Sequence, residues 1–223
     1  MSLRKPVRGA RTAALFALVL SVALLSGCAT APAHRPAAPM LGDKSVEAGV
    51  GTHLAFGREE MAVGSSAWVD GQVAKGVSVF VRGSGADFFS YQGNQPPFDD
   101  VLVSGGGGLR WTGEYLEGLT LGVEGILEYE QRTGPAARQL VAATFGVPAA
   151  EKAGEGFWVY TDVQLGLAVP FATAEGEPPF FGFMEVPLGL AWQPVDWLVV
   201  MGEGGLYLPL SGGYGAVAVS FRL

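Results

Sequence analysis

The feature that most constrains the fold is a period-two alternation that confines charge to one face of each segment. The stretch LTLGVEGILEYEQR, residues 119–132, shows it clearly: Glu124, Glu128 and Glu130 share one parity, and mainly leucine, valine and tyrosine occupy the other. Alternation with this period is typical of a β-strand with one polar and one apolar face. What the chain folds into depends on which of these faces meets water.

Segments of this kind recur to the end of the chain, and no window after residue 44 carries a sustained helical period. The predicted strands are residues 44–57, 60–73, 76–86, 100–112, 118–131, 139–148, 156–169, 181–193, 197–208 and 213–223. Since no helical crossover interrupts the series, neighbouring strands should pair antiparallel. The expected fold is all-β, an antiparallel up-and-down transmembrane β-barrel of about 10 strands, with about 8 or about 12 as alternatives.

Three observations favour a barrel with its apolar face outward over a soluble sandwich or barrel, which would alternate in the same way. Strands of roughly ten to fourteen residues suit a tilted crossing of a bilayer. The charged face carries arginine but no lysine, and arginine tolerates burial by pairing with carboxylates. Aromatic residues gather at segment ends, as girdle residues of a membrane barrel do: Phe56, Trp111, Tyr129, Phe157, Trp192 and Phe221. Placing Glu124 in hydrocarbon instead would cost about 2 kcal/mol.

We therefore expect the charged side chains to form a network in the lumen. Its members are Glu47, Arg82, Arg110, Glu124, Glu128, Asp162, Glu185, Glu203 and Arg222. A ten-stranded barrel is narrow, so buried carboxylates need arginines, protons, water or cations beside them. The network either plugs the lumen and stiffens the barrel, or lines a narrow cation-preferring pore.

The first residues have the layout of a secretory signal. Four basic residues between positions 4 and 11 precede the apolar run AALFALVLSVALL, which is too short to span a bilayer as a helix. The run ends in LSGC, which closes at Cys28 and resembles the bacterial lipobox. This resemblance implies acylation of Cys28, palmitate included, and a lasting membrane anchor. We expect residues 1–27 to be a cleaved lipoprotein signal peptide, 28–43 the acylated cysteine with an Ala/Pro-rich tether, and 44–223 the barrel.

From residue 44 to its end the chain resembles a small bacterial outer-membrane β-barrel protein. The closing AVAVSFRL is similar to the C-terminal strand that the barrel-assembly machinery recognises, although Leu223 stands where the family usually has an aromatic residue. The resemblance implies an outer-membrane location with the lipid anchor in the periplasmic leaflet. It also implies outer-membrane lipid and the barrel-assembly and lipoprotein-processing machineries as partners.

Connection lengths predict the orientation. With both chain ends on the periplasmic side, the short connections VAKG, EYLEG and QPVD fall on that side, and PAAEKAGEG is a longer exception. The Pro-Pro connections SYQGNQPPFDD and ATAEGEPPF fall on the outer side, because outer-membrane barrels keep short turns in the periplasm. The neighbouring Tyr91, Phe98 and Phe180 are then candidates for contact with an envelope protein partner.

Composition and motifs argue against several other functions. Without the leader's four basic residues, 10 of the 14 Lys and Arg remain against 21 Asp and Glu, so no nucleic-acid partner is expected. The stretch SGGGGL, residues 104–109, lacks the lysine and the helix of a phosphate-binding loop. Its glycines are expected to make room for facing side chains such as Trp158 or Tyr160. No residue spacing suits a zinc site, and no metal or cofactor is expected.

We do not expect an enzyme. Ten-stranded barrels include the omptin proteases, which place an Asp pair and an Asp-His pair at the outer rim. This chain has Asp99 and Asp100, but His53, the only histidine after the tether, has no aspartate near it in the sequence. The His-x-Ser arrangement of outer-membrane deacylases is also absent at His53. We expect His53 to be a polar lumen residue bound to a carboxylate such as Glu47 or to a cross-strand neighbour.

The function expected from these patterns is that of a lipid-anchored outer-membrane β-barrel with a largely plugged acidic lumen. It would act as a structural, surface-interaction or assembly component. The alternatives are the narrow cation-preferring pore and a tethered soluble β-barrel that binds an apolar ligand in the periplasm.

Overall fold

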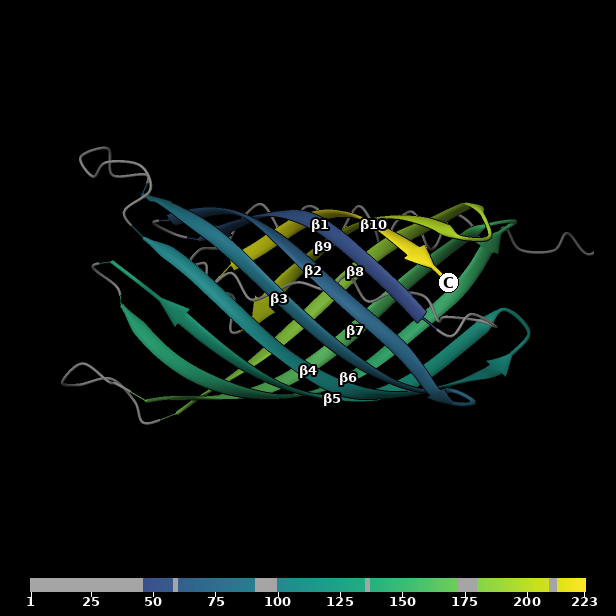
Figure 1. The fold of residues 1–223 in the computed structure, drawn as a ribbon, viewed down its shortest axis with the longest axis horizontal. Helices are drawn as coiled ribbons and strands as arrows, with labels where there is room; N and C mark the ends of the chain where they lie inside the picture. Colours follow the sequence, from purple (N-terminus) through teal and green to yellow (C-terminus); the bar gives the residue numbers. More distant parts are fainter. Residues whose placement is uncertain (1–45, 58–59, 91–99, 135–136, 172–179, 209–211) are drawn as a thin grey trace, which may run out of the picture.

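The computed structural model describes residues 46–57, 60–90, 100–134, 137–171, 180–208 and 212–223. Within them each strand pairs antiparallel with its sequence neighbours, and the first strand pairs with the last, so the sheet closes into a barrel (Figure 1). The strands are β1 (Val46–Gly57), β2 (Glu60–Ala74), β3 (Val77–Ser90), β4 (Val101–Leu116), β5 (Leu119–Arg132), β6 (Arg138–Gly154), β7 (Phe157–Pro170), β8 (Phe181–Val195), β9 (Leu198–Leu208) and β10 (Gly212–Arg222). The expected up-and-down barrel of ten strands is confirmed.

Three strands extend at least four residues beyond their predicted ends, β3 to Ser90, β4 to Leu116 and β6 to Gly154. The prediction of a long connection at PAAEKAGEG is therefore wrong, because this stretch mostly continues β6. The connection itself is only residues 155–156, where Gly156 has φ of 68°, a conformation that glycine adopts without strain in a tight hairpin. The end of β6 was missed because it is exposed on both faces and so carries no apolar alternation.

Short connections mark the end of the barrel that carries the first residue of β1 and the last residue of β10. Residues 75–76, 117–118, 155–156 and 196–197 are all two-residue connections at this end. Both Pro-Pro pairs, together with Tyr91 and Phe98, lie outside the described residues. Phe180 is described, and its side chain is exposed.

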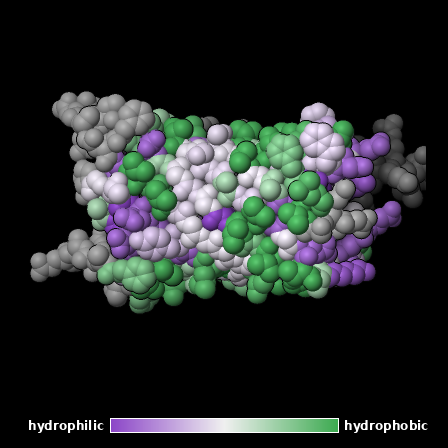
Figure 2. Space-filling view, in the orientation of Figure 1, coloured by the Kyte–Doolittle hydropathy of each residue, from purple (hydrophilic) through white to green (hydrophobic). Residues whose placement is uncertain are grey.

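The outer wall is apolar. Large exposed side chains follow it on every side of the barrel, among them Val81, Leu109, Leu127, Phe145, Leu165, Leu190 and Val217. Figure 2 shows hydrophobic residues over much of one face of this wall and hydrophilic residues gathered toward its two ends. The described residues contain no helix that is long and apolar enough to cross a membrane.

Aromatic rings gather on the wall near the short connections. Phe157 stacks on Trp192 with ring centroids 5.9 Å apart, and Trp197 stacks on Phe221 at 6.1 Å. Such stacked rings at the end of the strands are typical of the aromatic girdle that membrane barrels place at the lipid–water interface.

Inside the barrel, aromatic side chains lie over glycines of neighbouring strands. A Cβ on Gly189 would lie 2.2 Å from Cζ of Tyr160, and a Cβ on Gly205 would lie 2.3 Å from a ring carbon of Tyr214. Gly108 of SGGGGL serves the same purpose, but not for Trp158 or Tyr160 as predicted. The ring of Phe80 occupies the space above Gly108, since a Cβ there would lie 2.7 Å from its Cζ. Glycine at these positions therefore lets large rings fill the lumen.

Candidate functional site

The charged lumen is the candidate site, because the sequence concentrates its titratable side chains there. All nine predicted network residues lie on the inner face of the barrel, and the acids among them are 1% to 9% exposed. Their inward direction follows from the strand period, which places successive side chains on opposite faces. Four groups of ion pairs lie along the lumen, and two further acids share a tyrosine hydroxyl.

The first group joins the two strands that close the barrel. Glu47 of β1 lies opposite Arg222 of β10 in the register, and Nε of Arg222 donates to Oε2 of Glu47 at 2.9 Å. Nη1 of Arg222 also donates to Oε1 of Gln193 at 3.3 Å. The side chains of Arg222 and Glu47 are 5% and 1% exposed, so this ion pair is buried.

The second group surrounds Arg110 of β4. Its Nε and Nη2 contact Oε2 of Glu124 at 2.7 and 2.6 Å, and its Nη1 lies 4.0 Å from Oδ2 of Asp70. Gln164 donates to both neighbouring acids, at 3.2 Å to Glu124 and 2.8 Å to Asp162. Two buried carboxylates therefore lie next to Arg110, and Gln164 connects a third, that of Asp162, to Glu124.

The two acids that share Gln164 approach each other above a glycine. A Cβ at Gly146 of β6 would lie 2.7 Å from Cγ of Glu124 and 2.8 Å from Oδ1 of Asp162. Any larger residue at this position would push the carboxylates apart, so Gly146 permits the close approach of two like charges in a buried place.

The third group explains another glycine of SGGGGL. Nη2 of Arg82 donates to Oε2 of Glu128 at 2.6 Å, although Arg82 is on β3 and Glu128 is on β5. Gly106 of β4 lies between them, opposite Arg82 on one side and opposite Glu128 on the other. Because Gly106 has no side chain, the ion pair passes over it.

Tyrosine has a place in the network that the sequence analysis did not foresee. The hydroxyl of Tyr214 lies 2.8 Å from Oε1 of Glu185 and 2.7 Å from Oε1 of Glu203. The ring of Tyr207 lies beside it, with centroids 5.6 Å apart. Glu185 and Glu203 were expected in an arginine network, and the structure places them together around this hydroxyl.

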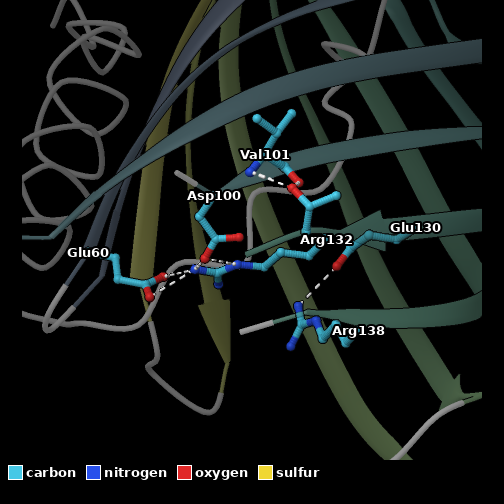
Figure 3. A network of polar contacts seen from close by, with 7 residues as sticks. Glu60, Asp100, Val101, Glu130, Arg132 and Arg138 are labelled. Atoms are coloured by element: carbon cyan, nitrogen blue, oxygen red, sulfur yellow. Dashed lines mark hydrogen bonds and ion pairs between the residues drawn. The ribbon is translucent and has the colours of Figure 1, made fainter. Parts of the chain in front are cut away.

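The fourth group lies at the end of the barrel opposite the short connections and was also missed. Nη2 of Arg132 contacts Glu60 at 2.9 and 3.0 Å and Asp100 at 2.7 Å, and Nε of Arg132 contacts Asp100 at 3.0 Å. Beside it, Arg138 donates to Glu130 at 3.0 Å. Figure 3 shows the Arg132 side chain pointing toward Glu60 and Asp100, and Arg138 toward Glu130.

A signal for this fourth group was present in the sequence. Arg132 continues the parity of Glu124, Glu128 and Glu130, and Glu60 begins the second predicted segment. The predicted strand ends at residue 131, one residue before Arg132, and therefore does not include the arginine.

The residues considered for catalysis or modification are placed as follows. His53 faces the lumen from β1 and is 3% exposed, with its ring close above Gly64. Asp100 is bound by Arg132, whereas Asp99 lies outside the described residues, as do Cys28 and the tether. Among the residues that the structure describes, no group of three or more histidine, cysteine or acidic side chains has the arrangement of a metal site.

Comparison with known proteins gives a likeness of fold. No protein-family model matches the chain. No curated protein matches it either. Among solved structures, an outer-membrane channel from Pseudomonas putida F1 is similar with a TM-score of 0.56 and 6% identity, over 87% of this chain and 100% of the channel.

Two further solved structures are less similar. The translocator domain of the autotransporter NalP from Neisseria meningitidis has a TM-score of 0.45 and 8% identity over 96% of both chains. The outer-membrane protease OmpT from Escherichia coli has a TM-score of 0.45 and 6% identity, over 81% of this chain and 94% of the protease. The chain thus has the fold of a bacterial outer-membrane β-barrel, and identities of this size say nothing about activity.

Proposed function

We propose that this protein is a lipid-anchored outer-membrane β-barrel with a largely plugged acidic lumen, which acts as a structural, surface-interaction or assembly component. The apolar outer wall, the stacked rings near one end and the charged interior support an outer-membrane location. Outer-membrane lipid and the barrel-assembly and lipoprotein-processing machineries are its proposed partners. An envelope protein would bind at the end of the barrel that carries Phe180.

The main support for a plugged lumen is that paired and packed side chains fill the interior. Ion pairs between strands lie inside the barrel at several levels, from Glu47–Arg222 through Arg110–Glu124 and Arg82–Glu128 to Arg132. Between them, the rings of Phe80, Tyr160 and Tyr214 lie over glycines. Side chains held by buried ion pairs and by ring packing resist displacement by water.

Planar-bilayer recordings of the purified protein test this proposal. A plugged barrel gives no steady conductance at any applied voltage. Steady conductance from the folded protein would overturn the plug and favour the narrow cation-preferring pore. In that case selectivity for cations should weaken in Glu124→Gln and Glu128→Gln.

A surplus of carboxylates is the observation that keeps the pore as a second candidate. The buried acids of the described residues are Glu47, Asp70, Glu124, Glu128, Glu130, Asp162, Glu185 and Glu203, and the arginines are Arg82, Arg110, Arg132, Arg138 and Arg222. A lumen with more buried acids than arginines attracts cations. The solved structure from Pseudomonas putida is described as a channel, which is compatible with this candidate on grounds of fold alone.

Membrane extraction distinguishes the integral barrel from a soluble barrel tethered in the periplasm that binds an apolar ligand. Cys28→Ala removes the proposed acylation site, and the variant should resist carbonate extraction because its wall faces hydrocarbon. Release into the carbonate supernatant would favour the tethered soluble barrel. Loss of labelled palmitate from the same variant would support the anchor, and Ala29 variants provide a control for processing.

We also propose that the protein is not an enzyme. His53 is the histidine that a protease or lipid hydrolase at the rim would need, and it lies among lumen side chains of β1. If purified protein cleaves peptide or ester substrates and His53→Ala abolishes that turnover, this part of the proposal is wrong.

A further inference from the structure

We infer that Arg132 forms a releasable latch that closes the lumen at the end opposite the short connections. The latch consists of Arg132, its two carboxylate partners Glu60 and Asp100, and Phe88 beneath the guanidinium. This inference rests on the proposed plugged lumen. It adds to that proposal the residues that close the lumen at this end of the barrel.

One side chain ties four neighbouring strands together. Arg132 is the last residue of β5, Asp100 directly precedes β4, Phe88 is on β3 and Glu60 begins β2. The guanidinium carbon lies 3.9 Å from the centroid of the Phe88 ring, and Nη2 contacts both carboxylates. A planar, forked cation over an aromatic face and between two acids is held in one orientation.

The register shows that this side chain reaches across the wall. Arg132 lies opposite Leu102 of β4, Leu102 opposite Ala86 of β3, and Ala86 opposite Gly64 of β2. Glu60 is four residues nearer the rim than Gly64 on β2. Arg132 therefore extends over β4 and β3 to meet it, and covers the lumen surface of both strands.

Short hydroxyl side chains lie directly below the latch. Ser66, Ser84, Ser104 and Glu130 oppose one another in the register of β2, β3, β4 and β5, one inward step deeper than the row that contains Arg132. Oγ of Ser84 and Oγ of Ser104 are 3.1 Å apart. Serines fill less space than the rings deeper in the lumen, so the latch controls access to a polar row that ends in a carboxylate.

The exposure of the partners makes the latch releasable. The Arg132 side chain is 6% exposed, whereas Glu60 is 32% exposed and Asp100 is 13% exposed. Water and salt can reach the carboxylates and compete for them, and ion pairs in contact with solvent weaken as ionic strength rises. The Arg110–Glu124 pair deeper in the lumen, with exposures of 5% and 1%, has no such access.

The second arginine at this end provides a matched control. Arg138 is 24% exposed and donates to Glu130, which is not one of the latch carboxylates. Arg138→Gln removes a positive charge from the same rim and leaves the contacts of Arg132 with Glu60, Asp100 and Phe88 in place.

Thiol labelling tests the latch. Ser104→Cys is introduced into the Cys28→Ala chain, the barrel is refolded in detergent, and the rate of reaction with a cationic, water-soluble methanethiosulfonate is measured. Arg132→Gln should raise this rate about tenfold, because the closed state loses charged hydrogen bonds. Arg138→Gln should change it by less than about twofold. A thiol introduced by Ser78→Cys, near the other end of the lumen, should not respond to Arg132→Gln.

Several outcomes overturn the inference. Equal labelling rates in Arg132→Gln, Arg138→Gln and the parent would do so, as would an equal rise at residues 104 and 78. Heat-modifiable migration on a gel checks that each variant is folded. If Arg132→Gln does not fold, the test uses the parent that carries Ser104→Cys and no arginine substitution. The labelling rate of this parent should rise with salt concentration, and a rate that does not depend on salt contradicts the latch. Steady conductance of the parent would refute the proposed plug, but it would leave the labelling difference between arginine variants as a separate result.

Discussion

Replacing Arg110 by leucine removes the cation beside Glu124 and Asp70. Arg110 and Glu124 are 5% and 1% exposed and joined at 2.6 and 2.7 Å, so neither charge is well solvated in the folded barrel. Removing one partner of such a buried pair destabilises a protein by about 3 to 5 kcal/mol. The loss should fall at the upper end of this range, because Arg110→Leu leaves two acids beside each other above Gly146.

Substitutions of the acids should have smaller and ordered effects. Glu124→Gln keeps an oxygen that accepts from Arg110 and removes a like charge from beside Asp162, so it should destabilise by about 1 to 2 kcal/mol. Asp162→Asn should change stability by less than about 1 kcal/mol, because relief of like-charge repulsion offsets the lost hydrogen-bond strength. The double variant Arg110→Leu/Glu124→Leu leaves neither charge of the ion pair buried without its partner. Its loss of unfolding free energy should therefore be smaller than the summed losses of Arg110→Leu and Glu124→Leu.

Urea unfolding of the refolded barrel in detergent, followed by tryptophan fluorescence, gives these free energies. The slope of the unfolding free energy against urea must stay constant across the series, because otherwise the variants differ in more than stability. The reasoning is refuted if Arg110→Leu destabilises by less than about 1 kcal/mol. It is also refuted if Asp162→Asn is more damaging than Arg110→Leu.

Three further predictions concern packing, hydrogen bonding and turn geometry. Gly108→Ala should destabilise the barrel by about 1 to 3 kcal/mol, because the new Cβ would meet the carbonyl oxygen of Gly125 and the ring of Phe80. Gly125→Ala is its control, since nothing lies within 4 Å of that position, and equal losses in urea unfolding would count against the packing argument. Tyr214→Phe should destabilise by about 1.5 to 3 kcal/mol, because it removes a hydroxyl that contacts two buried carboxylates; an unchanged melting temperature would contradict this. Gly156→Val should slow refolding and destabilise by about 1 to 2 kcal/mol, since φ is 68° there, and refolding followed on gels at the rate of the parent would contradict it.

The inward and outward directions of side chains were predictable from the sequence because a strand has a fixed period of two. The direction of Glu124, for example, follows from Leu121, Val123 and Leu127 on the opposite parity. Residue parity does not depend on turns or on the tilt of the strands. Strand ends were harder to place where alternation disappears, as at the exposed end of β6.

Which charges meet was not predictable in the same way. Arg82 reaches Glu128 across Gly106, two strands away, and Tyr214 reaches Glu185 from a strand that is not its neighbour. Such contacts depend on the register of several hairpins and on the stagger of the closed sheet, which the alternation leaves undetermined. Arg132 was missed for a simpler reason, because a boundary placed one residue early removed it from the charged face.

The ion pair between Glu47 and Arg222 has a consequence for how the chain acquires its structure. The two residues are 175 positions apart, so their contact joins the first and last strands of the described barrel and has a far higher sequence separation than the pair Arg82–Glu128. Contacts of such long range form late, after local hairpins have made the intervening strands. Until then β1 and β10 are open edges, which can pair with other chains. The Glu47–Arg222 pair thus forms together with the pairing of β1 and β10, and this pairing removes the two edges at which aggregation would begin.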